Sequence, residues 1–282
     1  MTQIGAVPVT LGSLPLSVVD DAGVTWLNTD LKGWSSPGLR TELQPRQADH
    51  GAWASPSYLD ARPITITGMI SAPSVTARDA AIERLIAASS LTDTTLTVAD
   101  STPKQATVRR SGEVLVELMG LYGARYSLAV TAADPRRYST VLQSETTGLP
   151  SVTGGLNLPI TLPITISTTM VSGAITLSNG GSITTRPTLT ITGPVVTPTI
   201  VAALPGGSVT QIIYGDTLQT GDVLVIDSAA RTVVLNGTAS RRLYFSGTWP
   251  EIPAGSAVTY SWSSPVYEST ALLTGTCRSA WM

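Results

Sequence analysis

The stretch GDVLVIDSAARTVVLNGTASRRLYFSG, residues Gly221–Gly247, decides the fold class. DVLVID alternates with period two, so that Asp227 and Leu224 lie on opposite faces of a predicted strand. RTVVLNG runs back after the short SAA connection, and Asn236-Gly237 supplies the positive φ angles of a tight hairpin turn. RRLYFSG is then expected to be the third strand of a β-meander.

The preceding tract has the same strand pattern. GAITLS, TLTIT and SVTQIIY alternate apolar and polar residues, as half-buried strands do. Between Thr146 and Gly215 the sole charged residue is Arg186, and Thr, Ser, Gly and Pro are abundant. We read this tract as sheet with hydroxyl-bearing outer faces. Its first part, TTGLPSVTGGLNLPITLP, is expected to cross between two domains.

The N-terminal half is predicted to be β-rich too. RPITITGMI, residues Arg62–Ile70, places Ile64 and Ile66 on one side, and ARYSLAVTAADP alternates in the same way. Residues 1–140 hold 12 basic and 13 acidic side chains, whereas residues 141–282 hold 5 and 6. The crossing segment that begins at Thr146 predicts a boundary near residue 145, with an N-terminal domain over 1–145 and a C-terminal domain over 146–282.

One segment has a helical pattern, TARDAAIERLIAASS, residues 76–90. Thr76 is the expected N-cap, with Asp79 in the capping-box position. Leu85 shares its face with neighbouring apolar residues, while Arg78 is expected to lie towards water. A single amphipathic helix in a β-rich chain is expected to pack on a sheet.

Composition excludes several classes of protein. A net charge of −2 offers no electrostatic attraction for nucleic acid, and no apolar run is long enough to cross a membrane. Cys277 is the only cysteine, so an intrachain disulfide is impossible and a secreted disulfide scaffold is excluded. The N-terminus lacks the basic segment of a signal peptide, which predicts synthesis in the cytoplasm without membrane insertion.

Few residues suit catalysis. His50 is the only histidine, so any Ser-His or Cys-His pair would need it, and we expect it to be structural beside Gly51. GWSSPG at residues 33–38 lacks the second glycine of a nucleophile elbow, and its proline obstructs a following helix. No metal-ligand, phosphate-binding or dinucleotide motif occurs. We therefore predict no enzyme activity, no catalytic residue, no metal and no cofactor.

Two sets of side chains leave other functions open. Glycoside hydrolysis needs two carboxylates flanking a cleft, which a wall-degrading enzyme would take from Asp216, Asp222, Asp227 and Glu251. The meander already explains these four as turn and strand-edge residues. Separately, Trp249, Tyr260 and Trp262 are candidates for stacking on a sugar, although aromatic side chains more often belong to a core or an interface.

The order of motifs resembles that of the distal tail proteins of long-tailed phages. HGAWASPSYLDARPITITGMISAP, a single helix and ARYSLAVTAADPRRYS resemble the N-terminal domain of that family. RPTLTITG, GDVLVIDSAARTVVLNG and SGTWPEIPAGSAVTYSW resemble its C-terminal domain. The resemblance covers most of the chain, in the expected order, whereas the uncharged tract departs from a plain sandwich.

The resemblance implies a mainly β structure, with an N-terminal domain that forms a ring of six copies and a galectin-like C-terminal β-sandwich. It implies a structural role in the virion tail tip (baseplate), joining the tail tube protein to the hub or tail-associated protein. The tape measure and receptor-binding proteins are further expected partners. DNA is expected to pass through the lumen without specific binding. The alternative function is a carbohydrate-binding module that recognises host cell-wall glycans.

Overall fold

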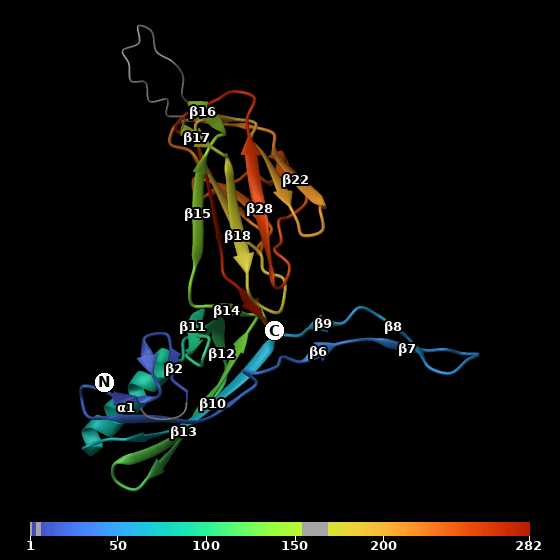
Figure 1. Ribbon diagram of the computed structural model, residues 1–282. Helices are drawn as coiled ribbons and strands as arrows, with labels where there is room; N and C mark the ends of the chain where they lie inside the picture. Colours follow the sequence, from blue (N-terminus) through green and yellow to red (C-terminus); the bar gives the residue numbers. More distant parts are fainter. Residues whose placement is uncertain (1, 4–6, 154–168) are drawn as a thin grey trace, which may run out of the picture. The chain divides into compact units, whose positions relative to one another are not determined.

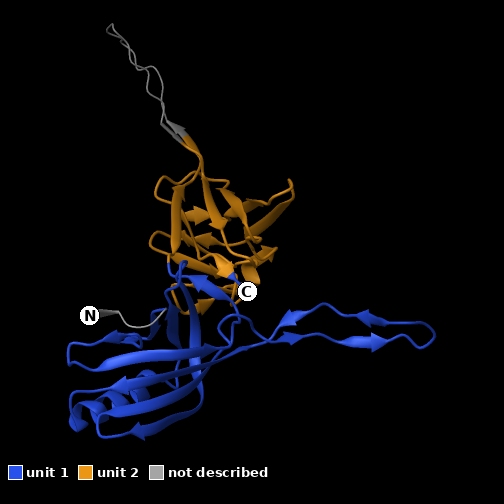
Figure 2. Cartoon of the chain, turned by 60° about the horizontal axis from the view of Figure 1, so that its bottom comes forward, with its two compact units in different colours: residues 1–140, 281–282 blue, residues 141–280 orange. Residues whose placement is uncertain are grey.

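The computed structural model describes residues 2–3, 7–153 and 169–282, and it divides the chain into two compact units. Unit 1 holds residues 1–140 and 281–282, and unit 2 holds residues 141–280 (Figure 2). Residue 145, near which the crossing segment placed the boundary, lies in the first strand of unit 2. Strands dominate both units, which confirms the predicted mainly β fold class.

Unit 1 contains one long helix and a set of strands (Figure 1). The elements are β1 (Thr2–Gln3), β2 (Val9–Leu11), β3 (Leu14–Pro15), β4 (Val18–Val19), β5 (Thr25–Lys32), β6 (Leu39–Arg40), β7 (Leu43–Pro45), β8 (Ala52–Ala54), β9 (Tyr58–Leu59), β10 (Arg62–Ser71), α1 (Val75–Ala88), β11 (Thr94–Val98), β12 (Lys104–Met119), β13 (Gly123–Ala132) and β14 (Arg137–Ser139).

The main sheet of unit 1 has the strand order β1-β4-β5-β10-β13-β12-β11-β2-β3, and β14 also pairs with β12. Period-two alternation explains its central strands, because Ile64, Ile66 and Ile70 on β10 are buried, whereas Thr65, Thr67 and Met69 are partly exposed. Helix α1 covers this apolar face and adds Ala81 and Leu85 to the core. The opposite face of the sheet stays open to solvent.

Helix α1 spans Val75–Ala88, close to the range 76–90 predicted from the sequence, but two predictions about its residues were wrong. Its N-cap is Ser74, not Thr76, and the Ser74 hydroxyl accepts a hydrogen bond from the Ala77 N–H at 3.1 Å. Arg78 does not lie towards water: it is buried, and its guanidinium bonds Asp79 and the Leu121 carbonyl oxygen. Sequence spacing could not reveal this contact, since the acceptor comes from a distant turn.

Unit 2 is a sandwich of a six-stranded and a five-stranded sheet. The orders are β15-β29-β19-β24-β25-β26 and β18-β28-β21-β22-β27, and both sheets contribute to one apolar core. The elements are β15 (Gln143–Gly148), β16 (Ser151–Thr153), β17 (Thr169–Val171), β18 (Ala174–Asn179), β19 (Thr188–Thr192), β20 (Val195–Val196), β21 (Thr199–Ala203), β22 (Val209–Tyr214), β23 (Thr217–Leu218), β24 (Val223–Asp227), β25 (Thr232–Leu235), β26 (Ala239–Ser240), the 3₁₀ turn η1 (Arg242–Tyr244), β27 (Phe245–Gly247), β28 (Ser256–Ser263) and β29 (Leu272–Cys277). β30 (Ala280–Trp281) follows at the end of the chain.

The opening stretch folds largely as predicted. Leu224 and Ile226 are buried on β24, and Asn236 takes φ 51° in the turn between β25 and β26. The prediction for the third strand of the meander was wrong. β26 is the third strand of the meander, whereas RRLYFSG forms the turn η1 and then β27, which pairs with β22 in the other sheet.

The uncharged tract contributes several strands to the sandwich, among them β18, β19 and β22. The segment expected to cross between domains is only partly described, because residues 154–168 lie outside the described residues. Its beginning belongs to β15, which pairs with β29, and β16 pairs with β17.

Candidate interaction surfaces

Four long strands of unit 1 leave two edges unpaired. Within the described ranges β4 meets β5 only at Thr25, and residues 26–32 pair there with β10 alone. At the other side, β11 pairs only with Lys104–Val108 of β12, so residues 111–119 have only β13 beside them among the described residues. Open strand edges present unpaired N–H and C=O groups and invite pairing with another chain.

The directions of these strands suit head-to-tail pairing. β5, β10, β13 and β12 are antiparallel at each step, so β5 and β12 run in opposite directions. If β12 of one copy lay beside β5 of the next copy, the antiparallel alternation would continue without a break. Such a contact joins two different surfaces and forms a ring when its rotation closes.

A β-ribbon formed by β6, β7, β8 and β9 projects from unit 1, and we call it the arm (Figure 1). β6 pairs with β9, and β7 pairs with β8. Its large apolar side chains are exposed: Leu39 (67%), Leu43 (62%), Trp53 (64%) and Tyr58 (59%). An isolated two-stranded ribbon is at best marginally stable in water. A partner that covers these side chains is therefore expected.

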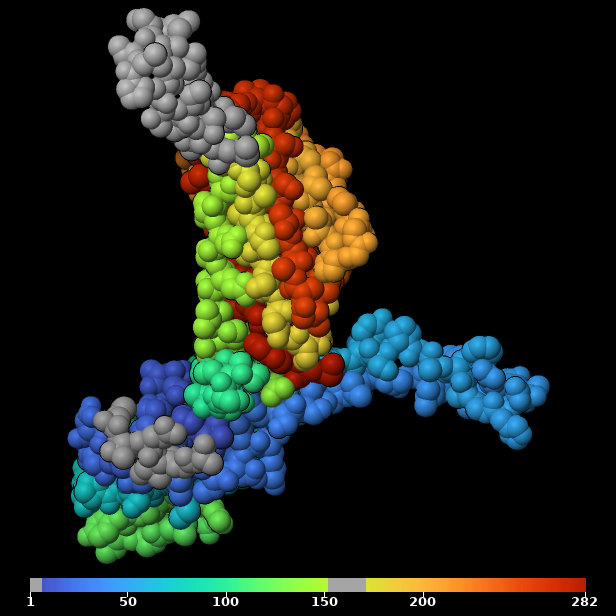
Figure 3. Space-filling view, viewed as in Figure 1, coloured from blue at the N-terminus to red at the C-terminus, as the bar shows by residue number. Residues whose placement is uncertain are grey.

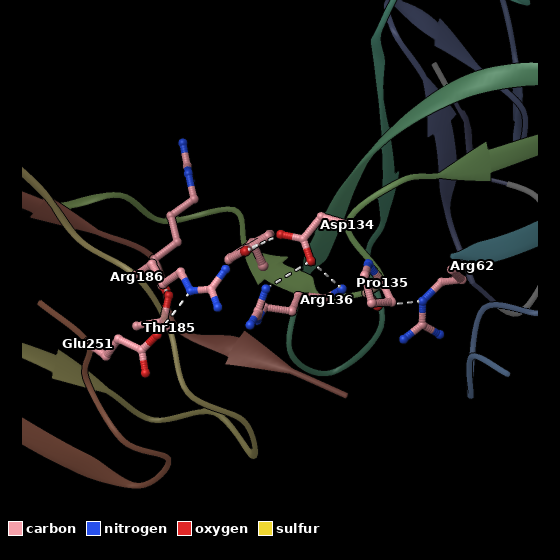
Figure 4. Close-up of polar contacts among 9 residues, drawn as sticks. Arg62, Asp134, Pro135, Arg136, Thr185, Arg186 and Glu251 are labelled. Atoms are coloured by element: carbon pink, nitrogen blue, oxygen red, sulfur yellow. Dashed lines mark hydrogen bonds and ion pairs between the residues drawn. The ribbon is translucent and has the colours of Figure 1, made fainter. Parts of the chain in front are cut away.

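The root of the arm is built around Arg62, which is fully buried. Its guanidinium donates to three backbone oxygens: to Trp34 at 2.5 Å, to Gly33 at 3.3 Å and to Pro135 at 2.8 Å, the last of which is drawn in Figure 4. No carboxylate pairs with it among the described residues, and burial, with the charge of Arg137, lowers the pKa of Arg62 to about 10. Arg62 thus ties the start of the arm to the strand that follows it.

Gly33 makes this root possible. It has φ +81°, and a Cβ there would lie 2.0 Å from the Pro63 carbonyl oxygen. Next to Pro135, Asp134 accepts hydrogen bonds from Arg136 (Figure 4) and from the Tyr138 hydroxyl. The base of the arm is therefore rigidly held, whereas the arm itself is exposed.

The three candidate sugar-stacking residues do not form one surface. Tyr260 and Trp262 are buried in the core of unit 2, and the Trp262 indole N–H donates to the Gly148 oxygen at 2.8 Å. Their rings cannot stack on a sugar from there, which corrects the prediction for these two residues. Only Trp249 is partly exposed, and its ring stacks on Phe245 at 4.4 Å between centroids.

A small cavity of about 310 Å³ adjoins Trp249. Arg231, Glu251 and hydroxyl side chains contribute to its lining. Glu251 also forms an ion pair with Arg186 at 3.2 Å (Figure 4). An aromatic ring beside charged and hydroxyl groups is chemically suited to a single sugar ring.

The four candidate carboxylates have separate local roles. Asp216 accepts from the Thr217 N–H, Asp222 from Asn236, and Asp227 from two N–H groups of the following turn. Glu251 pairs with an arginine, as described above. Within the described ranges, no three His, Cys, Asp or Glu side chains cluster closely enough to hold a metal ion. These contacts are those of turn residues.

The structure also shows where His50 and Cys277 lie. His50 is exposed near the tip of the arm, and its N–H bonds the Asp49 carboxylate. Cys277 is a buried thiol on β29. Among the described residues, no helix is sufficiently long and apolar to span a bilayer. Sequence reasoning missed the arm and the two open edges, because the apolar residues of the arm, Leu39, Leu43, Trp53 and Tyr58, do not alternate with period two.

Comparison with known proteins gives two kinds of match. Residues 180–270 match the family model of the siphovirus-type tail component, C-terminal domain. The whole fold is similar to the crystal structure of SPP1 Dit, described as a paradigm of the hub adsorption apparatus in phages that infect Gram-positive bacteria. That match has a TM-score of 0.64 and 12% identity, over 99% of this chain and 100% of that chain.

Two structures of the phage P2 baseplate in its activated conformation are also similar. The form with Ca matches at TM-score 0.48 and 10% identity, over 94% of this chain and 100% of that one. The form with Sr matches at TM-score 0.49 and 10% identity, over 96% and 98%. A search of curated protein sequences finds no match. Residues 180–270 thus match the model of the siphovirus-type tail component, C-terminal domain, and the whole chain has the fold of SPP1 Dit.

Proposed function

We propose that this chain is a structural protein of the phage tail tip that assembles as a six-membered ring. In this proposal the ring joins the tail tube to the baseplate hub, scaffolds receptor-binding components and leaves a lumen through which DNA passes. Unit 2 is the outward, galectin-like sandwich. The tape measure protein is an expected neighbour inside the tail.

The observation that carries the proposal is the set of four long strands, β5, β10, β13 and β12, in which β5 and β12 each have a stretch with no second neighbour among the described residues. Pairing β12 with the β5 of the next copy satisfies both edges at once. Four strands from each of six copies, spaced by about 4.8 Å and tilted by about 40°, give a barrel roughly 45–50 Å across. A barrel of that width accommodates a DNA duplex.

The arm supports the same assembly. From its root to its turn the arm has about nine residues, or roughly 30 Å at 3.3 Å per residue. One four-stranded sheet covers only about 20–25 Å of the ring circumference. The arm is therefore long enough to lie across the neighbouring copy and bury its exposed apolar side chains there.

The open face of the sheet suits a channel for DNA. Asp30 and Lys32 on β5 form an ion pair at 3.5 Å, and Glu117 on β12 lies opposite Arg125 on β13. Charges of both signs alternate with hydroxyl side chains such as Thr65. A lumen lined by this face would not hold phosphate groups, whereas a basic lumen would.

The experiment is imaging of the purified protein at high concentration and of intact tails. The expected result is a six-fold ring with an open centre, located between tube and hub in the tail. A variant in which residues 41–56 of the arm are replaced by a short Gly-Ser turn is expected to remain folded but monomeric. Intact tails with no ring of this chain between tube and hub would overturn the proposal.

A carbohydrate-binding function is the second candidate, and the cavity beside Trp249 favours it. Trp249→Ala should abolish binding of host wall polysaccharides on a glycan array. Trp53→Ala on the arm is the matched control, because its ring is exposed in unit 1. Absence of binding by the unchanged protein would remove this candidate without affecting the ring.

A further inference from the structure

The sequence contains two Asn-Gly steps, Asn179-Gly180 and Asn236-Gly237, and both lie in unit 2. Asparagine before glycine is especially prone to deamidation, because glycine has no Cβ to shield its backbone nitrogen from the asparagine side chain. The reaction requires that this nitrogen reach the side-chain carbon Cγ. The two steps therefore form a matched pair within one unit, and their surroundings decide which of them reacts.

The Asn179 step is locked at both reacting groups. Asn179 is 1% exposed and ends β18, whose atoms (yellow, Figure 3) are flanked by those of β15 (yellow-green) and β28 (red). The Gly180 N–H donates to the Ser279 hydroxyl at 3.0 Å. The Asn179 side-chain amide makes five further hydrogen bonds, to the oxygens of Ile183, Ile252 and Pro253 and from the N–H groups of Gly181 and Ala280. Neither reacting group is free to move towards the other.

The Asn236 step, in contrast, has a free nucleophile. Asn236 and Gly237 are both exposed, and they take φ 51° and 74° in the turn between β25 and β26. The Thr238 N–H closes this turn on the Leu235 oxygen at 3.2 Å. Among the described residues the Gly237 N–H has no hydrogen-bond acceptor. Its nitrogen is therefore available for reaction.

Two hydrogen bonds hold the Asn236 side chain within the described part of the chain, and we call them the clasp. Oδ1 accepts from the Val223 N–H at 2.9 Å, and Nδ2 donates to the Asp222 carboxylate at 2.9 Å. The bond from Asn236 is the largest cause that lowers the pKa of Asp222. The same carboxylate accepts from the Gln219 N–H at 2.8 Å, so it joins the turns on either side of β24 and β25. The bond between Asn236 and Asp222 is exposed, and water competes with it.

We propose that Asn236 is a site of spontaneous modification in the folded protein, which deamidates whenever the clasp opens, while Asn179 is protected. The Gly237 nitrogen attacks Cγ of Asn236: a bond between them forms, the Cγ–Nδ2 bond breaks, and ammonia leaves with the proton of the Gly237 amide. Water then opens the resulting five-membered succinimide ring. Breaking the new bond gives aspartate, and breaking the original peptide bond gives isoaspartate.

The modification would separate the two turns that the clasp joins. A carboxylate at position 236 has no N–H to donate, and it would face the Asp222 carboxylate at hydrogen-bonding distance, where like charges repel. Asp222 would keep its bond from Gln219 and lose its link to the turn after β25. Because ammonia is lost, the clasp cannot form again. Deamidation of Asn236 thus loosens this end of unit 2 irreversibly with age.

The test incubates the folded protein at mildly alkaline pH and follows deamidation of Asn179 and Asn236 by mass spectrometry of proteolytic peptides. A sample unfolded in urea gives the rates of the two steps without the fold. Asp222→Ala removes the acceptor of the clasp, and Asp222→Asn is the matched control, because its side-chain oxygen can still accept the bond. Asn236→Asp represents one product, and hydrogen exchange at the Val223 N–H measures whether the clasp is lost.

Similar rates at both steps are expected in urea. In the folded protein Asn236 should deamidate at least about ten-fold faster than Asn179, which has three more side-chain hydrogen bonds and an engaged glycine nitrogen. Asp222→Ala should accelerate Asn236 roughly five-fold, the factor that one net hydrogen bond contributes, and Asp222→Asn should not. Exchange at Val223 should be faster in Asn236→Asp.

The proposal is overturned by equal rates at the two steps in the folded protein, or by no reaction at Asn236 while the urea sample is converted. An Asp222→Ala variant with an unchanged rate, or with equal acceleration at Asn179, would refute control by the clasp. Unaltered exchange in Asn236→Asp would refute the loosening. None of these outcomes affects the proposed function, because the inference does not depend on the ring.

Discussion

Replacing Arg62 by Met separates two opposing effects at the arm root. The guanidinium donates to three backbone oxygens, two of them at 2.8 Å or less. Hydrogen bonds from charged donors contribute about 1.5–3 kcal/mol each, so their loss costs about 5 kcal/mol. Met cannot donate, and it leaves the buried oxygens of Trp34 and Pro135 without their partner.

The opposing effect is that Met removes the free-energy cost of burying the charge of Arg62 in the folded state. Burial, with a contribution from Arg137, lowers the pKa of Arg62 from 12.5 to about 10, and this corresponds to about 3 kcal/mol that the folded state loses by keeping the charge. Because that pKa is depressed in the folded state, the cost is fully present at neutral pH. The net expectation for Arg62→Met is therefore a destabilisation of unit 1 by about 2 kcal/mol.

Urea unfolding measures the free energy, and hydrogen exchange locates the change. Exchange is expected to rise first in residues 33–37 and 60–63 at the arm root, with unit 2 unaffected. Arg109→Met is the control, since its ion pair with Asp93 is exposed and contributes at most about 1 kcal/mol. A methionine variant as stable as the unchanged protein, with unaltered exchange, would refute the argument that Arg62 holds the arm.

Three further outcomes are expected. In Gly275→Val, overpacking should lower the free energy of unfolding of unit 2, measured with urea, by about 2 kcal/mol, because a Cβ at this position would lie 2.4 Å from the Ile175 side chain. An unchanged urea midpoint would contradict this, because the core would then have rearranged around the added side chain. Burial tends to raise the pKa of Asp20, but hydrogen bonds from Arg84 and Trp26 outweigh it and lower that pKa. The ionised Asp20 carboxylate therefore stabilises the folded state above about pH 4, and this stabilisation is lost on acidification. Asp20→Asn should flatten the pH dependence of the free energy of unfolding, and an unaltered curve would contradict this. Burial, then Glu145, raises the pKa of the Cys277 thiol to about 11, so Ellman's reagent at pH 8 should label it only after unfolding.

Strand periodicity predicted most of the fold. β10, β13 and β24 have the faces that the sequence indicated, because an alternating strand buries one face wherever it lies. The same signal was overlooked in β28, where Tyr260 and Trp262 alternate with serines and are buried for that reason. Attention to period two would have excluded these two residues as a sugar platform.

Other features depend on contacts between distant segments. Arg78 looks like a solvent-facing helical residue, yet it bonds a turn 43 positions later. An open edge is not a property of a strand's own residues, since it depends on how far the neighbouring strand extends. The unpaired half of β12 therefore becomes visible only once β11 is seen to begin at Thr94, opposite Val108. The candidate interaction surfaces belong to this second class.

Disulfide mapping in intact tails tests the central claim most directly. One cysteine replaces Leu115 on β12, and a second replaces, in separate variants, Leu27, Asp30 or Lys32 on β5. Neighbouring antiparallel strands bring Cα atoms to about 4.5–5.5 Å, within the range of a disulfide, whereas β5 and β12 of one copy are separated by two strands. On oxidation, one of these pairs should give a covalent ladder that ends at six copies. A ladder that stops at two, or no cross-link for any pair, would contradict ring closure through the β5 and β12 edges.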